Sequence, residues 1–335
     1  MTNSLNIIAE IAQGFEGRPG QARLLMKAAA SGGADAAKYQ LVYADELATP
    51  DYKYYELFKS LEMSDEIWAE LASYASELGI ELHLDIFGLR SLKLAEKLRV
   101  GAIKLHGTDI ANIGLLKAVA ASKVKSVLLG AGGAHANEIE QAINILSAKE
   151  VVVLLGFQGY PTLNETNQIA RVRLLVERFT KTYPNVTVGF ADHALPDSPL
   201  RYALAAGALG AGATVLEKHI TLGKVMKLED HEAALNPDEF FEFCQVARAC
   251  SEAIGLTSQQ DDFGMSEAEY AYRKMIRRHV VTGRRLEAGS KISATDVVLK
   301  RTSSNNIITD LASVYNKTLR SSLEVNMPIS PAEIE

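Results

Sequence analysis

Two histidines, His193 and His219, have the type and placement that point most directly to chemistry. Each ends an apolar run, in FADHAL and VLEKHIT respectively. Imidazole nitrogens from the ends of two neighbouring strands can bind one divalent ion, such as Mn²⁺, Fe²⁺, Co²⁺ or Zn²⁺, and leave positions open for solvent. Such an ion would act as a Lewis acid on an aldehyde oxygen. The alternative is that each histidine is a core residue hydrogen-bonded to a neighbour.

Two lysines, Lys38 and Lys104, lie inside other apolar runs. Ammonium groups that face one lumen repel each other unless an anion lies between them, so this pattern indicates a carboxylate or phosphate ligand. A buried lysine could instead form a Schiff base with a carbonyl substrate, as in aldolases. The chain has no P-loop, and GAGG after Leu129 is too short for a dinucleotide-binding loop.

These residues can meet only in a fold that brings the ends of several strands together. The chain up to about residue 257 has the sequence pattern of such a fold. Apolar runs alternate with helical segments, and the runs cover residues 7–12, 36–42, 81–87, 102–106, 126–129, 151–157, 186–191 and 214–221. Strand and helix repeated eight times predict a TIM (β/α)₈ barrel, whereas an open doubly wound sheet usually stops at five or six strands. Ser64 is expected to cap the following helix, and Pro237 to open another.

In such a barrel, functional groups lie at the carboxyl ends of the strands. The polar residues at or near the ends of the predicted strands are Glu10, Gln13, Lys38, Gln40, Asp85, Lys104, His106, Asp109, Gln158, Tyr160, Asp192, His193, Glu217, Lys218 and His219. Residues two apart share a strand face, so Glu217 and His219 point together and Lys218 points the other way. Charges in apolar strands are costly unless they are paired or used, so a structural ion-pair network is the alternative to an active site.

Composition favours a small-molecule partner. The net charge is −6, from 35 Lys+Arg and 41 Asp+Glu, with no basic run to bind nucleic acid or an anionic membrane. We expect no signal peptide or membrane span, and therefore a cytoplasmic location. The cysteines, Cys244 and Cys250, are six apart in an expected helix and cannot readily bridge, so both are predicted to be buried thiols.

The periodicity changes after Gly255. The polar segment LTSQQDDFGMSEAE indicates a linker, placed at 258–272, between a barrel domain at 1–257 and a β-rich domain at 273–335. A unit of about 60 residues is at the lower edge of independent stability, so we expect it to pack against a barrel.

At this point the residues resemble the sialic acid synthase family, which includes the N-acetylneuraminate, legionaminate and pseudaminate synthases. The resemblance spans essentially the whole chain and rests on IIAEIAQGFEG, GADAAKYQ, AIKLHGTDIANIGLL, GYPT, FADHAL, VLEKHIT and LEDHEAALNPDEF. It implies a metal-dependent condensation of phosphoenolpyruvate with an aldose, such as an N-acylated hexosamine, in surface polysaccharide biosynthesis. It also implies that the second domain is the family's antifreeze-like domain.

The resemblance also implies a role for individual residues. His193 and His219 would hold the metal, expected to be Mn²⁺, with Asp230 beside it. The catalytic residues would be Glu10, Asp109 and Asp230. The substrate-binding residues would be Lys38, Gln40, Lys104, Tyr160 and Arg301. Arg301 would reach the barrel of a partner subunit in a domain-swapped homodimer.

Several positions depart from the family pattern. Gly14 and Phe15 replace an asparagine and a histidine, Gly130 and Ala131 replace a serine and a threonine, Asp85 replaces a threonine, and Asp109 replaces a glutamate. Two other hypotheses therefore stand beside the synthase: a Schiff-base aldolase or lyase on the same barrel, and a catalytically silent barrel that binds a sugar.

Overall fold

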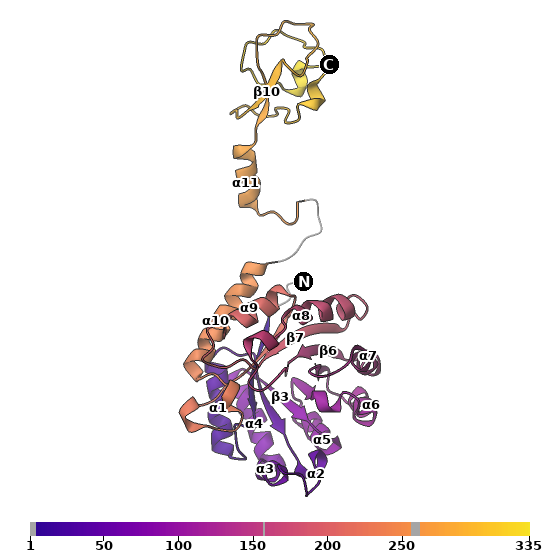
Figure 1. Cartoon of the computed structure of the whole chain (residues 1–335), viewed down its shortest axis with the longest axis vertical. Coiled ribbons are helices and arrows are strands. Elements are labelled where there is room, and N and C mark those ends of the chain that lie inside the picture. Colours follow the sequence, from indigo (N-terminus) through magenta and orange to yellow (C-terminus); the bar gives the residue numbers. More distant parts are fainter. Residues whose placement is uncertain (1–4, 157, 256–261) are drawn as a thin grey trace. The chain divides into compact units, whose positions relative to one another are not determined.

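The computed structural model describes residues 5–156, 158–255 and 262–335, and the chain divides into two compact units, Met1–Gly255 and Leu256–Glu335. The first unit is a closed parallel barrel whose strands follow chain order, with β1 also paired to β8 (Figure 1). The strands are β1 (Asn6–Ala12), β2 (Ala36–Leu41), β3 (Glu81–Ile86), β4 (Ala102–Leu105), β5 (Ser126–Gly130), β6 (Glu150–Leu155), β7 (Val186–Asp192) and β8 (Val215–His219). The predicted barrel is confirmed. The predicted end of the sixth run, Phe157, lies outside the described residues.

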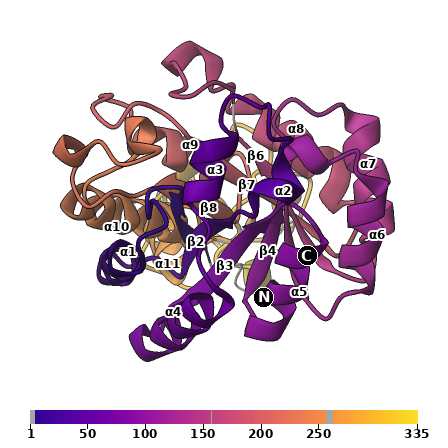
Figure 2. The same ribbon diagram turned by 90° about the horizontal axis from the view of Figure 1, so that it is seen from below.

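Helices cover the outside of the barrel, and Figure 2 shows α4 to α7 around the strands. The helices that follow the strands are α1 (Pro19–Ser31), α4 (Asp65–Leu78), α5 (Leu89–Leu98), α6 (Ile113–Ala121), α7 (Ala136–Ile145), α8 (Ala170–Leu175), α9 (Ala203–Gly210) and α10 (Pro237–Ile254). Two short helices, α2 (Ala44–Leu47) and α3 (Tyr55–Ser60), lie in the segment between β2 and α4.

Local sequence sets the helix ends. Ser64 Oγ accepts a hydrogen bond from the Ile67 amide at 3.4 Å, so this residue caps α4 as predicted, and Gly79 ends the helix in a left-handed conformation. Pro237 is the first residue of α10, also as predicted. Proline fits there because a backbone N–H in the first turn would have no acceptor within the helix. These signals place the helices between consecutive strands.

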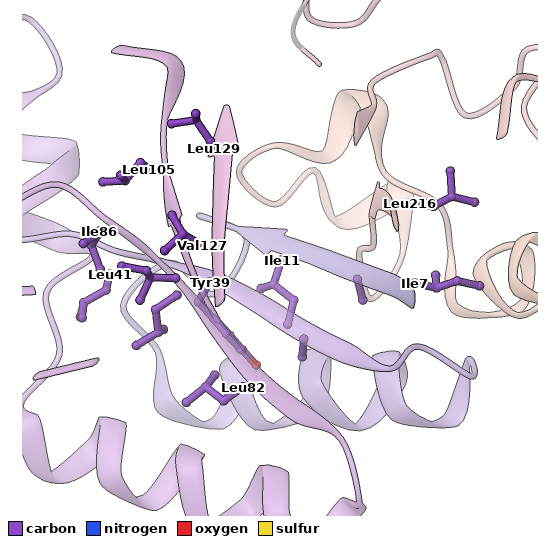
Figure 3. Packing of buried hydrophobic residues seen from close by; sticks show 14 of the residues in the cluster. Ile7, Ile11, Tyr39, Leu41, Leu82, Ile86, Leu105, Val127, Leu129 and Leu216 are labelled. Carbon is purple, nitrogen blue, oxygen red and sulfur yellow. The ribbon is translucent and has the colours of Figure 1, made fainter. Parts of the chain in front are cut away.

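Strand alternation divides the apolar residues into two cores. The outward-facing side chains pack under the helices, and Figure 3 shows Ile7, Ile11, Tyr39, Leu41, Leu82, Ile86, Leu105, Val127, Leu129 and Leu216 among them. The inward-facing side chains form a separate cluster inside the barrel: Ile8, Ala36, Ala102, Leu128, Val152 and Val215. These side chains therefore fill the inside of the barrel at the level of this cluster, as inward-facing side chains do in other eight-stranded barrels.

The second unit has its own small core, which includes Val280, Leu286, Ile292 and Val314. Its sheet pairs β9 (His279–Thr282) with β10 (Val297–Lys300) in antiparallel fashion. Helix α11 (Glu267–Ile276) begins within the predicted linker 258–272 and opens with a capping box between Ser266 and Glu269. Residues 258–261 of that linker lie outside the described residues.

The two cysteines lie on α10, and neither is bridged. Cys244 is buried, but Cys250 is only half-buried, so the prediction of two buried thiols is wrong for the second. Side chains six residues apart on a helix lie about 120° apart around its axis, which carries Cys250 away from the face that packs on the barrel. Within the described residues, no helix is both long and apolar enough to cross a membrane.

Candidate active site

A layer of charged side chains lies directly beyond the apolar cluster inside the barrel. Its members come from five strands, and four of them follow a member of that cluster by two residues: Glu10, Lys38, Lys104 and Glu217, with Asp85 from β3 as the fifth. Because residues two apart share a strand face, the alternation that points Ile8 inward also points Glu10 inward. We call these five residues the charged layer.

The charged layer is a closed network of ion pairs. Lys38 Nζ contacts Glu10 Oε2, donates to Asp85 Oδ1 at 2.6 Å, and lies 3.5 Å from Glu217 Oε2. Lys104 Nζ donates to Glu217 Oε1 at 2.7 Å and lies 3.6 Å from Glu10 Oε2. All five residues are buried, with at most 8% of their surface exposed. Three carboxylates face two ammonium groups, so the layer carries one more negative than positive charge when all five are ionised.

The two glutamates of this layer have opposite pKa shifts. Burial raises the pKa of Glu10 to about 8, although Lys38 opposes the shift. Burial also acts to raise the pKa of Glu217, but Lys104 and Lys38 together outweigh it and hold that pKa well below its usual range. Burial would lower the pKa of Lys38, but Asp85, Glu10 and Glu217 raise it instead, so the lysine is an ammonium. Two carboxyl groups with separated pKa values suit acid and base roles, with Glu10 able to hold a proton at neutral pH.

His193 and His219 lie side by side, with ring centroids 5.3 Å apart. Tyr160 packs edge-on against both rings, at 5.7 Å and 5.6 Å. Burial is the main cause that lowers the pKa of His193 to about 3 and the pKa of His219 well below its usual range, so both rings are neutral at physiological pH. Neutral imidazoles present lone pairs, as a metal ion requires.

The histidine pair therefore fits a metal with two protein ligands. His219 Nδ1 is buried and has no hydrogen-bond partner among the described residues, a feature that it shares with His83 Nδ1 and His279 Nδ1. Over the same residues, no three His, Cys, Asp or Glu side chains lie close enough to hold an ion together. An ion on His193 and His219 would thus keep open positions for solvent and substrate.

Asp230 connects the loops around the histidines. Its backbone is left-handed, with φ of 62°, and its Oδ2 accepts a hydrogen bond from the Gln13 amide at 3.0 Å. The Tyr160 hydroxyl donates to the Asp230 carbonyl oxygen, and Gln13 Nε2 donates to Gln40 Oε1 at 2.8 Å. Burial raises the pKa of Asp230 to about 6. The loops after β1, β6 and β8 are thereby held together beside the histidines.

A cavity of about 520 Å³ opens next to the charged layer and reaches Lys104 and His193. Its wall is mostly backbone, formed by Gly107, Gly130, Gly132, Gly133, Gly156 and Gly159, and we call it the glycine-lined cavity. A Cβ added at Gly156 would lie 2.6 Å from Ala191 Cβ, and one at Gly130 would lie 2.8 Å from the Gly107 nitrogen. The strand ends therefore approach closely only because these positions lack side chains.

A second cavity of about 480 Å³ adjoins the first, since His106 and Thr108 line both. Its other lining residues are Gln13, Gln40, Glu46, Leu47, Tyr52, Phe58, Phe87 and Asp109, and we call it the aromatic cavity. The site therefore has two compartments, one walled by backbone and one walled by aromatic and polar side chains.

The model of the NeuB family matches residues 25–259, and a protein of Methanocaldococcus jannaschii is 30% identical over 95% of this chain and 91% of its own length. The chain belongs to the NeuB family. The N,N'-diacetyllegionaminic acid synthase of Legionella pneumophila is 27% identical, over 98% of this chain and 94% of the synthase. The N-acetylneuraminic acid synthetase structure from Leptospira borgpetersenii has the same fold, with a TM-score of 0.72, 23% identity, and coverage of 82% and 93% of the two chains.

In this NeuB-family chain, the barrel brings most of the predicted site residues together. Glu10, Lys38 and Lys104 meet in the charged layer, while Gln40, Tyr160, Asp230 and the two histidines lie around it. Asp109 lies apart, on the wall of the aromatic cavity, where its Oδ1 accepts from Asn112 Nδ2 at 3.0 Å. Arg301 belongs to the second unit, where its Nε donates to the Ile276 carbonyl at 3.2 Å. Their roles in binding and catalysis remain predictions.

Other groups of the site were not assigned a role from the sequence. Glu217 and Asp85 hold the two lysines, and the signal for them was a carboxylate inside an apolar run on the inward face. Tyr52 and Phe58 carry no such signal, because their segment resembles an ordinary surface loop. Phe15 is a core residue, with its ring centroid 5.8 Å from that of Tyr39 and 5.7 Å from that of Trp68.

Proposed function

We propose that this chain condenses phosphoenolpyruvate with an aldose or N-acylated amino sugar, giving a 3-deoxy-ulosonic acid and phosphate for a surface polysaccharide. The supporting observation is that Lys104 belongs to the charged layer and also lines the glycine-lined cavity beside His193. An ammonium group beside a cavity that is lined by backbone can bind a small ligand that carries both a carboxylate and a phosphate. The names of the family's characterised relatives support the same class of reaction.

C3 of phosphoenolpyruvate forms a bond to the aldehyde carbon, water adds at C2, and phosphate leaves with cleavage of the C2–O bond. Lys104 would neutralise the acid groups of phosphoenolpyruvate, and Glu10 would hold the proton that the aldehyde oxygen needs as it becomes a hydroxyl. Glu217 stays ionised beside Lys104 and keeps that ammonium oriented.

We propose that His193 and His219 hold a divalent ion, Mn²⁺ first, with Asp230 close to it. A bound ion would withdraw electron density from the aldehyde oxygen. We also propose that Arg301 of one protomer reaches the sugar in the barrel of a second copy, which would make a homodimer the active form.

The pairing of the lysines argues against a Schiff-base aldolase. An imine forms only from a neutral amine, and Lys38 lies against the Glu10 and Asp85 carboxylates, which raise its pKa and favour the ammonium form. Lys104 Nζ is engaged by Glu217 Oε1 at 2.7 Å. A silent sugar-binding barrel would have no use for a buried layer of five charges beside two neutral histidines, since such a layer is costly to bury.

The test is phosphate release from phosphoenolpyruvate with the full chain and a panel of aldoses and N-acylated amino sugars, in Mn²⁺ and in excess chelator. We expect release with at least one sugar and its loss in chelator. Borohydride with pyruvate should trap no adduct on Lys38 or Lys104. Absence of release with every sugar, from protein that binds Mn²⁺, would overturn the proposal in favour of the silent barrel.

A further inference from the structure

An ion pair that the proposed function does not use lies behind the two histidines. Asp192 is the last residue of β7, Lys218 is the last but one of β8, and the two are opposite each other in the strand register. Lys218 alternates with the inward-facing Glu217 and His219, so its side chain points out of the barrel. Lys218 Nζ lies 3.2 Å from Asp192 Oδ1, and at most 1% of either residue is exposed.

The pair holds both backbone polar groups of Ala194, the residue that follows His193. Asp192 Oδ1 accepts a hydrogen bond from the Ala194 amide at 2.8 Å, and Lys218 Nζ donates to the Ala194 carbonyl oxygen at 3.1 Å. The Thr162 amide donates to the His193 carbonyl oxygen at 2.8 Å. Lys218 therefore links the backbone beside His193 to the strand that ends at His219.

Packing of the barrel alone does not account for this pair. The residues one step earlier in the same register, Phe190 and Leu216, are apolar and belong to the core under the helices. Replacement of a buried ion pair by well-packed apolar side chains is often neutral or stabilising. Asp192 Oδ2 is also buried without a hydrogen-bond partner among the described residues, which adds to the cost. An apolar pair could not supply the two hydrogen bonds to Ala194.

We propose that Asp192 and Lys218 are positioning residues, which fix His193 relative to His219 and thereby set the affinity of the histidine pair for its divalent ion. This inference rests on the proposed function, which supplies the ion. The two ring centroids lie 5.3 Å apart. Distances from a metal to its ligands are held to within about 0.2 Å, so a small shift of the backbone at His193 would weaken binding. Asp192 and Lys218 act through that backbone and touch neither the ion nor the substrates.

The main test is the double variant Asp192→Leu with Lys218→Met, which removes both charges and keeps apolar bulk in their place. Electron paramagnetic resonance of free Mn²⁺ measures the affinity of the full chain without substrates. We expect binding to weaken by about 10-fold to 100-fold, as for other residues that orient metal ligands. The matched control is Phe190→Leu with Leu216→Met, which alters the preceding register pair on the same face and should leave the affinity unchanged.

Two further measurements separate positioning from a purely structural role. The urea midpoint, followed by the fluorescence of the single tryptophan, shows whether each variant is folded. The visible absorption of bound Co²⁺ depends on the geometry of its ligands, so we expect it to change in the double variant and to stay unchanged in the control. A purely structural pair would alter the urea midpoint alone.

Asp192→Asn is a smaller change for the case in which the double variant does not fold. The amide oxygen can still accept from the Ala194 amide, but the charge that holds Lys218 is lost. We expect Mn²⁺ affinity to fall by about threefold to tenfold, with a changed Co²⁺ spectrum.

The outcomes distinguish this inference from the proposed function. Wild-type Mn²⁺ affinity and Co²⁺ absorption in the folded double variant, or in Asp192→Asn if the double variant does not fold, would overturn the inference and leave the ion at the histidines standing. If the wild type binds no Mn²⁺, or if His219→Asn binds it equally well, the proposed ion is wrong and this inference fails with it.

Discussion

Lys38 Nζ lies 2.6 Å from Asp85 Oδ1, and both residues are completely buried in the barrel. Asp85 is the third carboxylate in a layer that has two lysines. An anionic ligand near Lys38 therefore meets one more negative charge than it would if an uncharged residue stood at position 85.

Asp85→Asn should therefore strengthen binding of phosphoenolpyruvate. The amide oxygen can still accept from Lys38, while Glu217 stays ionised beside both lysines. We expect KM for phosphoenolpyruvate to fall by roughly threefold to tenfold at constant KM for the sugar, as expected for removal of one charge at short range. Steady-state phosphate release measures both constants, and Asp35→Asn, which alters an outer ion pair with Arg248, is the control. A higher KM for phosphoenolpyruvate would show that Asp85 helps to bind it.

The buried carboxyl group of Glu10 should make the free energy of unfolding fall as pH rises. Its pKa rises from an ordinary 4.5 in the unfolded chain to about 8 in the barrel, so the folded state binds the extra proton between these values. The resulting stabilisation is complete below pH 4.5 and is lost as pH rises through 8. We expect the free energy of unfolding of the wild type, relative to Glu10→Gln, to drop by on the order of 2 kcal/mol between pH 6 and pH 9.

Urea unfolding followed by tryptophan fluorescence measures this difference. Trp68 is the only tryptophan and is buried on the inner face of α4, so its emission reports unfolding of the first unit. An offset between wild type and Glu10→Gln that stays constant from pH 6 to pH 9 would contradict the raised pKa.

Gly156→Ala should damage the glycine-lined cavity with little effect elsewhere. The new methyl group would lie 2.6 Å from Ala191 Cβ and 3.3 Å from His193 Cε1, so the ends of β6 and β7 would have to move apart. Overpacking of this kind costs about 1–3 kcal/mol, and we expect kcat/KM for phosphoenolpyruvate to fall by about tenfold or more. Gly20→Ala, whose methyl group meets no atom within 4 Å, is the control. Equal activity in the two variants would show that the cavity does not bind the substrate.

His219→Asn should weaken Mn²⁺ binding by on the order of 100-fold, because one of the two proposed imidazole ligands is lost. Electron paramagnetic resonance of free Mn²⁺ measures binding without reference to catalysis. His83→Asn is the control, since His83 is also buried but hydrogen-bonds Glu81 at 2.9 Å. If His219→Asn bound Mn²⁺ with unchanged affinity, the proposal that the ion binds at His193 and His219 would be wrong.

The sequence by itself determined the barrel and the direction of its inner side chains. Both follow from local periodicity: a strand alternates its faces every residue, so the inward placement of Glu10, Lys38, Lys104 and His219 can be read from single apolar runs. Helix starts at Ser64 and Pro237 are equally local, because each depends on the groups of one helical turn. Helix α11, which begins within the predicted linker, was not predicted, because its polar composition hides a helix that starts at a capping box.

Only the tertiary structure decided which charges meet. Lys38 contacts carboxylates from β1, β3 and β8, and those partners depend on the stagger of strands that are far apart in sequence. The two cavities are likewise spaces between loops from different repeats, so no single run of sequence encodes them. The placing of Tyr52 and Phe58 beside Asp109 follows from how the loops after β2 and β4 pack together, and no local pattern of period two or 3.6 records that arrangement.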